Sequence, residues 1–550
     1  MRKEMDRALV KGYLRASGKN IVNGDGDTVL LNGWGVGNWL LSEGYMWLGG
    51  GERFDRPRTI ENAVRELTGT KYSEYFWKEF RSRYLTKEDV RLMAELGYNS
   101  VRIPFNWRVF LENEPGLNWV EEGFRLIDRC LDWCEEYKIY AILDMHGAPG
   151  GQTGAGIDDS FDDMPRLFID ADSWAKAIAL WSKIAERYAD RWIVGAYDLL
   201  NEPVRQASAN PPRGHCDEYI PKLARFYDEV IPAIRKYDKN HMLTLEGHYW
   251  AKTPDFFVKR FDDNMAIHFH LYGWIGGWPE LKPFQGFLDV SEKLDQPLWI
   301  GETGENLNEW YTAMFQLMAD LGIGYCSWTW KKMQCKNSPL SVKKPRGWDD
   351  IIGFTKLGPR PSYENAQSIL NEYLDNMLAE NCESNIAVSR ACFRRPGTVV
   401  RGTDFDLFPG KGVSFSGTRA EPNPPAGPQA PESYRRECGM RIKEGRKMEK
   451  RPFFWDTAWE SFTLELTKDE FAIYSLHDAV AGSSVSFEIM AVEDAELEIT
   501  SDGKSLGHIT LDAGDGVVAT EPLAVLPLHR QAVKMTVKKG IIELDKVIFE

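Results

Sequence analysis

Two acidic residues draw attention because each closes a run of apolar residues. The segment 193–203, IVGAYDLLNEP, is apolar or small until it reaches Asn201, Glu202 and Pro203, and the segment 297–304, PLWIGETG, carries Glu302. Two carboxyl groups that meet in one pocket can divide acid–base work, because one can stay protonated while the other is ionised. This is the chemistry of glycoside hydrolysis. The same pair could instead hold a divalent metal ion.

The residues that end the other apolar runs favour acid–base chemistry over a metal site. A metal centre of this kind would need three or more acids at neighbouring strand ends, whereas most of these ends carry basic or aromatic groups. Arg102 could keep one of the two carboxylates ionised. We therefore expect no metal ion and no cofactor. The other residues at these ends are His146, Glu246, His270 with Tyr272, and Trp328.

The elements that must position these residues alternate along the chain from residue 28 to about 381. Short apolar runs predict strands, and segments with a 3.6-residue period between them predict helices. Eight such units predict a parallel sheet closed into a (β/α)8 TIM barrel. A doubly wound open sheet would need a glycine-rich phosphate turn after an early strand, and none is present. The predicted strands are 28–36, 98–105, 139–147, 193–203, 241–247, 264–272, 297–304 and 322–331. The predicted helices include 87–97, 120–137, 173–190, 217–238, 308–321 and 362–378.

In such a barrel the carboxyl ends of the strands converge on one face, where catalytic residues lie. We therefore expect the polar strand ends to be neighbours in space. This explains why the buried run 193–200 ends in an amide and a carboxylate.

Six motifs resemble the motif series of family 5 glycoside hydrolases, in family order and over about residues 20–381. They are RIPFNW (102–107), LDMHGAPGGQ (143–152), DLLNEP (198–203), HFHLY (268–272), IGETG (300–304) and SWTWK (327–331). The stretches HGAPGGQTG (146–154) and NWLLSEGYMW (38–47) are most similar to the exo-β-1,3-glucanase and β-glucosidase-like members.

The resemblance implies a role for each matching residue. Glu202 would be the acid/base and Glu302 the nucleophile of a retaining double displacement. Asn201 would bond the 2-hydroxyl of the sugar, and Arg102 and Tyr272 would hold the charge and orientation of the nucleophile.

Four further positions follow from the same resemblance. His270 would lie near the acid/base, His146 would bond a sugar hydroxyl, and Trp328 would form the floor under the reacting sugar. Glu43 would grip the hydroxyls of the terminal sugar, which blocks one end of the site and favours exo cleavage.

Several residues compete for these roles. His268 lies two residues before His270, so both face the same way in a strand; we favour His270 because Tyr272 continues the same face. Asp144 is expected to be a buried structural acid, and Glu305 to lie on a loop or at a helix N-terminus. Glu246 is expected at most to shape the sugar site. Just past two strand ends, the best candidates for additional sugar stacking are Trp250 and Trp274.

After residue 388 short alternating strands replace the helical period and predict a β-sandwich. The boundaries we expect are 1–381 for the barrel and 388–550 for the sandwich. The second segment resembles the jelly-roll carbohydrate-binding modules of family 6 type, and the aromatic residues available for binding are Phe408, Phe415, Trp455 and Trp459. Ser414-Phe415 replaces the usual aromatic of one motif, so glycan binding and simple packing against the barrel both remain open.

Composition limits the partners. The net charge of −15 argues against nucleic acid and anionic membranes, and no apolar run reaches the 18 residues of a membrane span. No signal peptide is recognisable at the N-terminus, so we expect a cytoplasmic protein, or a secreted or periplasmic one if a leader was removed. Eight scattered cysteines indicate reduced core thiols. No feature of the sequence indicates an oligomeric state.

Together these features predict a retaining β-glycoside hydrolase that acts on β-linked glucans or gluco-oligosaccharides, with exo action favoured. An endo-β-1,4-glucanase or a β-mannanase of the same family is the alternative. A catalytically silent glycan-binding scaffold is the alternative from another class.

Overall fold

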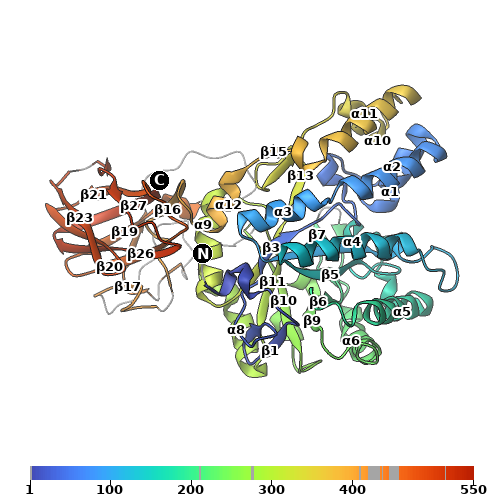
Figure 1. The fold of residues 1–550 in the computed structure, drawn as a ribbon, viewed down its shortest axis with the longest axis horizontal. Helices are drawn as coiled ribbons and strands as arrows, with labels where there is room; N and C mark the ends of the chain where they lie inside the picture. The colour runs from blue at the N-terminus through green and yellow to red at the C-terminus, as the bar shows by residue number, and fades with distance from the viewer. Residues whose placement is uncertain are drawn as a thin grey trace.

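The computed structural model describes residues 3–209, 212–273, 278–407, 410–418, 434–435, 438–444, 458–514 and 516–550. Eight parallel strands close into a barrel, as predicted (Figure 1). In barrel order, starting from the first in sequence, they are β3 (Asn32–Gly35), β4 (Ser100–Asn106), β5 (Tyr140–Gly147), β6 (Val194–Asp198), β9 (Met242–Glu246), β10 (Met265–Tyr272), β11 (Leu298–Gly304) and β12 (Gly324–Trp328).

Several strands are shorter than their apolar runs predict, among them β3, β6 and β12. β6 ends at Asp198, so the remaining residues up to Pro203 lie beyond the strand. This segment still follows the sheet, because the Leu199 amide bonds the Thr244 carbonyl and the Asn201 amide bonds the Met145 carbonyl. Asn201 and Glu202 therefore stand at the carboxyl end of the barrel, on backbone held from both sides.

Most strand residues are buried because side chains fill the barrel on one face and helices cover the other. Every residue of β4, β5 and β11 is buried. Three of the helices, α1, α2 and α8, were not singled out from the sequence. The long helices are α1 (Pro57–Thr68), α2 (Thr70–Arg83), α3 (Lys87–Leu96), α4 (Glu121–Tyr137), α5 (Ala171–Tyr188), α6 (Ile220–Arg235), α8 (Lys282–Leu294), α9 (Asn308–Asp320) and α11 (Tyr363–Asn376).

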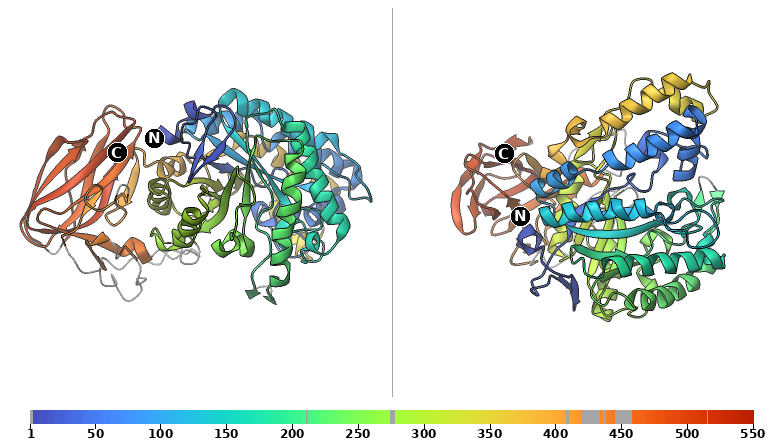
Figure 2. Two further views of the ribbon diagram at one scale, coloured as in Figure 1. Left: turned by 90° about the horizontal axis from the view of Figure 1, so that it is seen from below. Right: turned by 45° about the vertical axis from the view of Figure 1, so that its right-hand side comes forward.

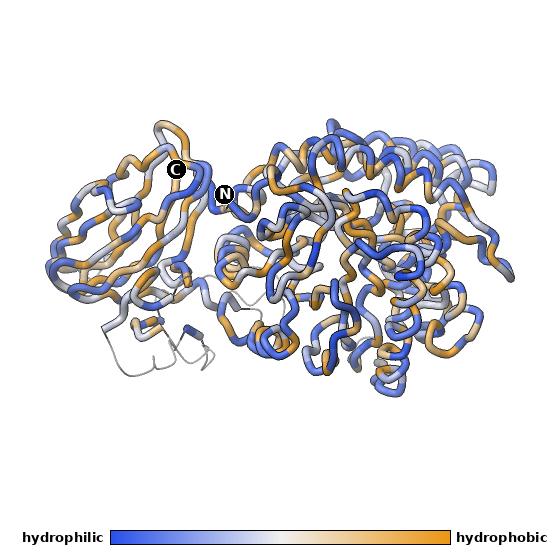
Figure 3. The backbone as a smooth tube through the Cα atoms, turned by 60° about the horizontal axis from the view of Figure 1, so that its bottom comes forward, coloured by the Kyte–Doolittle hydropathy of each residue, from blue (hydrophilic) through white to orange (hydrophobic). Residues whose placement is uncertain are grey.

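The C-terminal part forms two mostly antiparallel sheets, which agrees with the predicted sandwich (Figure 2). One sheet contains β16 (Thr398–Arg401), β18 (Arg441–Glu444), β19 (Phe462–Thr467), β21 (Ser484–Ala491), β24 (Val518–Ala519), β25 (Leu523–Ala524) and β27 (Ile541–Phe549). The other contains β17 (Phe415–Ser416), β20 (Phe471–His477), β22 (Ala495–Ser501), β23 (Lys504–Leu511) and β26 (Arg530–Lys539). Apolar and polar residues alternate along these strands, as Figure 3 shows for the backbone tube.

The sandwich packs against α9 of the barrel. Every residue of α9 from Trp310 to Asp320 is buried, although a helix on the outside of a barrel normally leaves one face exposed. Arg394 donates from Nε to the Thr312 carbonyl at 2.6 Å, and the Leu407 amide donates to Asp320 at 3.1 Å. The C-terminal part thus covers the outer face of α9.

Two further findings concern the whole of the described chain. No helix in these ranges is long and apolar enough to cross a membrane. All eight cysteines are free thiols, and six of them are buried.

Candidate active site

The two predicted acids meet at the carboxyl end of the barrel, on either side of His270. The Nδ1 atom of His270 lies 2.8 Å from a Glu202 oxygen and 2.9 Å from a Glu302 oxygen. One oxygen of each acid and this histidine nitrogen all lie within 4.8 Å of one another. Carboxyl groups about 5 Å apart are typical of glycosidases that retain configuration, whereas inverting enzymes separate them more widely.

Strand register accounts for this meeting. In the pairing of β10 with β11, His270 lies opposite Glu302. Glu202 reaches the same point from the turn after β6, where it takes the left-handed conformation with φ of 45°. Its amide donates to Glu246 at 2.6 Å and its carbonyl accepts from the Thr153 hydroxyl at 2.8 Å. The backbone of Glu202 is therefore fixed, and its side chain is turned toward His270.

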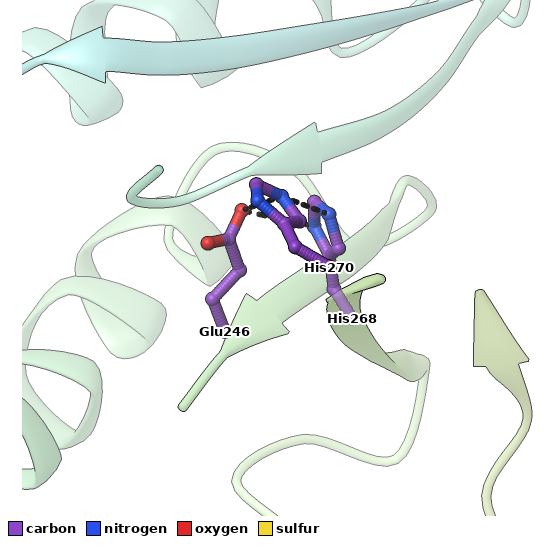
Figure 4. A group of neighbouring side chains, drawn as sticks. All are labelled: Glu246, His268 and His270. Atoms are coloured by element: carbon purple, nitrogen blue, oxygen red, sulfur yellow. Dashed lines mark hydrogen bonds and ion pairs between the residues drawn. The ribbon is translucent and has the colours of Figure 1, made fainter. Parts of the chain in front are cut away.

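Figure 4 shows His270 and His268 side by side, next to Glu246. The two histidines form a pair that carries one positive charge. Their Nε2 atoms lie 3.1 Å apart, a contact that one proton must bridge. Each Nδ1 faces a carboxylate, Asp198 in the case of His268, and so carries a proton of its own. Three protons on two imidazoles leave one net positive charge. Burial opposes that charge, but Glu246 and Glu302 raise the pKa of His270 well above its ordinary value.

The charge of the histidine pair acts on Glu302. Burial alone would raise the pKa of this carboxyl group, but the contact with His270 and the nearby guanidinium of Arg102 lower it to about 2. Glu302 is therefore a carboxylate at neutral pH, only 5% exposed and aimed into the pocket. A group of this kind can attack an electrophilic carbon without first losing a proton.

Arg102 is the second buried cation of the site. It is fully buried and donates to Asp198 at 2.9 Å and to the Asn201 side-chain oxygen at 2.8 Å. Its further carboxylate neighbours are Asp144 at 3.1 Å, Glu246 at 3.4 Å and Glu302 at 3.9 Å. A fan of five donors lets one guanidinium serve several acceptors at once, which a lysine cannot do.

Asn201 and His146 are oriented by the same network. Because the Asn201 oxygen accepts from Arg102, its amide nitrogen must face the other way, where His146 Nε2 lies at 3.2 Å. His146 Nδ1 donates to Asp144 at 2.8 Å, which leaves Nε2 free to accept. The hydrogen bonds thus determine both the amide orientation and the histidine tautomer.

A wall of the pocket comes from the segment after β3. Trp328 stacks on His146 with ring centroids 5.3 Å apart, and its Nε1 donates to the Tyr45 hydroxyl at 2.7 Å. Gly35 and Gly37 make room for the indole, since a Cβ atom would come within 2.7 and 2.5 Å of it. The same segment carries Glu43, two residues before Tyr45.

Glu43 carries the strongest upward shift among the acids at the mouth. It is 8% exposed, and burial raises the pKa of its carboxyl group to about 8. His146 opposes this shift, while Glu302 and Glu305 add to it. Glu43 is therefore protonated at neutral pH, where it can both donate and accept hydrogen bonds. Tyr272 lies on the other side, and after the effect of burial the charge of Glu302 contributes most to raising its pKa.

Comparison with known proteins identifies the family of this chain. The family model described as cellulase (glycosyl hydrolase family 5) matches residues 60–334, which is half of the chain. The chain belongs to glycosyl hydrolase family 5.

The names of similar proteins state several different activities. A beta-xylosidase of Phanerodontia chrysosporium is 33% identical over 48% of this chain and 52% of its own length. A probable glucan 1,3-beta-glucosidase A of Emericella nidulans is 25% identical over 50% of this chain and 66% of its own. The chain spans about half the length of the first curated relatives that it matches. Among solved structures, an endogalactoceramidase is 16% identical with a TM-score of 0.46, covering 97% of this chain and 99% of its own.

In this family 5 chain the structure brings most of the predicted site residues together. Direct contacts join seven of them, and charge effects place Glu43 and Tyr272 beside Glu302. Trp250 is half-buried on the short helix α7 (His248–Ala251), and no hydrogen bond or ring contact links it to this group among the described residues. Trp274 lies outside the described residues. The seven in contact are Arg102, His146, Asn201, Glu202, His270, Glu302 and Trp328.

Of the competing acids, Glu246 and Asp144 are fully buried, whereas Glu305 lies on the loop after β11, as predicted, and its charge acts on Glu43. Glu246 was expected at most to shape the sugar site, but it is fully buried and holds the amide of Glu202 and the histidine pair. Asp144 is a buried structural acid as predicted. Sequence reasoning missed Asp198, although it stands in the DLLNEP motif, and Gln152, which donates to the His146 and Asn201 carbonyls.

Two groups of side chains have donor atoms close enough to suggest a metal ion: Glu246, His268 and His270, and Glu202, His270 and Glu302. Neither group fits one. His270 Nε2 is engaged with His268, and its Nδ1 carries a proton toward the two acids. Arg102 also lies 3.4 Å from Glu246, so an added dication would face two existing positive charges.

Replacing Arg102 by Met tests the charge balance under the site. Four buried acids would lose their common partner, so the free energy of unfolding should fall by about 3–5 kcal/mol at pH 7. The pKa of these acids in the folded state should rise, so the folded variant takes up protons and the deficit shrinks between pH 7 and pH 5. Denaturant unfolding at both pH values measures this effect.

The matched control is Arg91→Met on the surface of α3, where Arg91 pairs with the exposed Glu88 and Glu95. The free energy of unfolding of this control should fall by less than about 1 kcal/mol. The proposed balance of buried charges would be contradicted in either of two cases. One is a loss of unfolding free energy in Arg102→Met no larger than in the control, and the other is a loss that grows as the pH falls.

Proposed function

We propose that this protein hydrolyses β-glycosidic bonds with retention of configuration, with Glu302 as the nucleophile and Glu202 as the acid/base. The observation that supports it most directly is the approach of the two carboxyl groups within 4.8 Å around His270. The low pKa of Glu302, about 2, fits the role of nucleophile. Glu202 is the more exposed of the two, with a side chain 13% accessible, as a group that must meet water requires.

In the first step the Glu302 carboxylate attacks the anomeric carbon while Glu202 gives its proton to the departing glycosidic oxygen. A covalent glycosyl ester on Glu302 and an ionised Glu202 result. In the second step Glu202 takes a proton from water, the resulting hydroxide displaces Glu302, and both acids return to their starting states.

The histidine pair suits this sequence of charges. Before the first step His270 faces the Glu302 carboxylate and a protonated Glu202. After it, His270 faces the Glu202 carboxylate and a neutral ester. Because Nδ1 contacts both acids, the buried cation is opposite one negative charge in either state, and little reorganisation is needed as the charge moves.

For the substrate we propose neutral β-linked glucans or gluco-oligosaccharides. The carboxylate of Glu302 disfavours anionic sugars through charge repulsion. The buried Glu43 beside Trp328 would close one end of the site and favour release of single sugars. Related proteins named endoglucanase make endo action on β-1,4-glucans the second candidate. Product sizing on a β-glucan distinguishes the two, because exo action releases only the monosaccharide and a ladder of oligomers would refute it.

A silent glycan-binding scaffold is less well supported. Such a scaffold gains nothing from four buried acids held by buried cations, whose assembly costs free energy through desolvation. A network that keeps Glu302 ionised serves a purpose if the Glu302 carboxylate takes part in a reaction.

For the C-terminal sandwich we favour packing over glycan binding. Of the aromatic residues considered for binding, Phe415 and Trp459 are buried, at 3% and 2% exposure. Phe408 and Trp455 lie outside the described residues. Trp278 on the barrel side meets Phe462 of β19 with ring centroids 5.6 Å apart, so aromatic residues here join the two parts.

Replacing Glu302 by Ala tests the nucleophile. Activity on an aryl β-glucoside should fall on the order of 10⁴-fold or more, since no covalent intermediate can form. Azide added to the variant should occupy the space left by the carboxylate and give a glycosyl azide of inverted configuration. The control Glu292→Ala removes an exposed acid on α8 that pairs with Lys19, and it should leave the rate unchanged. Wild-type activity in the Glu302 variant would end the proposal.

Replacing Glu202 by Gln tests the acid/base. Substrates with poor leaving groups should lose 10²–10⁴-fold in rate in the first step, while aryl glucosides with acidic phenols need little proton donation and should lose much less. The slope of log rate against leaving-group pKa measures the difference. An equal loss for all leaving groups would contradict the role of Glu202.

Replacing Glu43 by Gln tests the wall of the pocket. Its pKa of about 8 means that wild-type Glu43 ionises as the pH rises through 8, which adds a negative charge beside Glu302. Wild-type kcat/KM should therefore fall above pH 8, and Gln, an uncharged mimic of the protonated acid, should remove that decline. If kcat/KM declined in the same way above pH 8 in both proteins, Glu43 would not be the group that controls this decline.

A further inference from the structure

A cavity is lined mainly by residues of α1, α2 and α4. Figure 1 shows where these three helices lie. The volume of this cavity is about 410 Å³, which is within the range of small-molecule sites. A smaller cavity of about 30 Å³ adjoins it on the inner side. The two share four lining residues, Glu61, Trp77, Arg81 and Arg108.

Helical spacing explains why polar side chains gather here. On α2 the lining residues recur every three or four positions, which is one face of a helix: Thr70, Ser73, Glu74, Trp77, Lys78 and Arg81. α1 contributes Glu61 and Arg65, and α4 contributes Glu122 and Leu126, each pair four residues apart. Three helices thus turn one face each toward a common space.

Two donors in this space have no partner. The indole Nε1 of Trp77 is buried and makes no hydrogen bond, and a buried unsatisfied donor costs about 1–3 kcal/mol. The guanidinium of Arg81, one helical turn further on, makes no hydrogen bond or ion pair with any described residue; only its carbonyl is engaged, by Trp39. Burial lowers the pKa of Arg81 below its ordinary value, with Glu61 opposing that shift.

The other charges leave an excess of cations. Arg108 is already neutralised, because it pairs with Glu61 at 2.8 Å and with Asp159 at 2.7 Å. Arg65 and Lys78 make no ion pair within the described part of the chain.

Two acids of the lining remain, and neither makes an ion pair with Arg81, although the charge of Glu122 raises the pKa of Arg81. Glu74 is exposed, and Glu122 is 3.5 Å from Arg125, which is not among the lining residues. Once Arg108 and Glu61 are set aside as a pair, the lining holds three cations and two acids. The cations are Arg65, Lys78 and Arg81, and the acids are Glu74 and Glu122.

We propose that this cavity binds a phosphate group, either the free ion or a small phosphate monoester. The Trp77 Nε1–H and the Arg81 guanidinium would donate to its oxygens, and Arg65 and Lys78 would supply charge from the rim. The volume leaves room for the organic part of an ester beside the phosphate. An acceptor at this place would satisfy both unpaired donors, which the protein itself does not do.

The site borders the wall of the catalytic pocket. The inner cavity is lined by Ser42, which immediately precedes Glu43, and by Asn106 at the carboxyl end of β4. A ligand held there packs behind the segment that carries Glu43 and Tyr45. The proposal itself does not depend on the proposed hydrolysis, because the cavity contains neither of the two catalytic acids.

Isothermal titration of the full chain with sodium phosphate, at ionic strength matched with sodium chloride, tests the site. We expect saturable binding of one phosphate. Trp77→Phe removes only the donor and keeps an aromatic ring against Trp47, whose centroid is 5.8 Å away; Arg81→Gln removes the charge. Each should weaken binding by about tenfold or more, as expected for one lost charge-assisted hydrogen bond.

The control is Lys71→Gln, an exposed cation of the same helix outside the lining, and it should bind phosphate as the wild type does. Because the two donors have no protein partner, none of the three variants should unfold at a lower temperature than the wild type without phosphate. If Arg81→Gln fails to fold, Trp77→Phe still decides the question.

Glycerol 1-phosphate in place of phosphate distinguishes the two sources. Tighter binding of the ester assigns the outer space to its organic part, and equal binding assigns the site to the phosphate group alone; both support the proposal. Absence of saturable heat in the wild type, or equal affinity in the wild type, Trp77→Phe and Arg81→Gln, would overturn it.

Discussion

The charge shared by His268 and His270 is the interaction on which the rest of the site depends. Five carboxyl groups are gathered under and around the barrel mouth, and such a group needs buried cations to offset the repulsion among its carboxylates. Arg102 neutralises the group from the side of β4, and the histidine pair does so from β10. The five acids are Asp144, Asp198, Glu202, Glu246 and Glu302.

The backbone leaves little freedom in this arrangement. His268 packs over Gly301, where a Cβ atom would come 1.8 Å from its Nε2, so no other residue fits beneath the ring. Register places His268 opposite Glu246 on one side and His270 opposite Glu302 on the other. Strand pairing thus aligns each histidine with its acid, and the low pKa of Glu302 is a consequence of sheet geometry as much as of side-chain chemistry.

The two parts of the chain are joined by buried polar contacts as well as by apolar ones. Arg394 is 2% exposed and links the Thr312 carbonyl of α9 to Asp406 at 2.9 Å. α9 connects β11 to β12, the strands that carry Glu302 and Trp328. The sandwich therefore supports the helix behind the nucleophile strand, a role that needs no exposed aromatic residue. The domain boundaries at 381 and 388 stay a prediction.

The sequence by itself determined the barrel, the order of its strands and the residues that end them. This was possible because buried parallel strands are continuous apolar runs, and each run here ends in a polar group whose position along the chain is visible. It also placed Glu202 and Glu302 on the same face, since strands of one parallel barrel share their direction.

Tertiary structure decided what those residues are to one another. Which histidine meets the acids depends on register and on the close packing over Gly301, and Asp198 became important only through its contacts with Arg102 and His268. The pKa values of Glu302 and Glu43 arise from burial and from charges up to hundreds of residues away in sequence. Electrostatic interaction depends on distance in space and on exclusion of water, and neither can be read from the order of the residues.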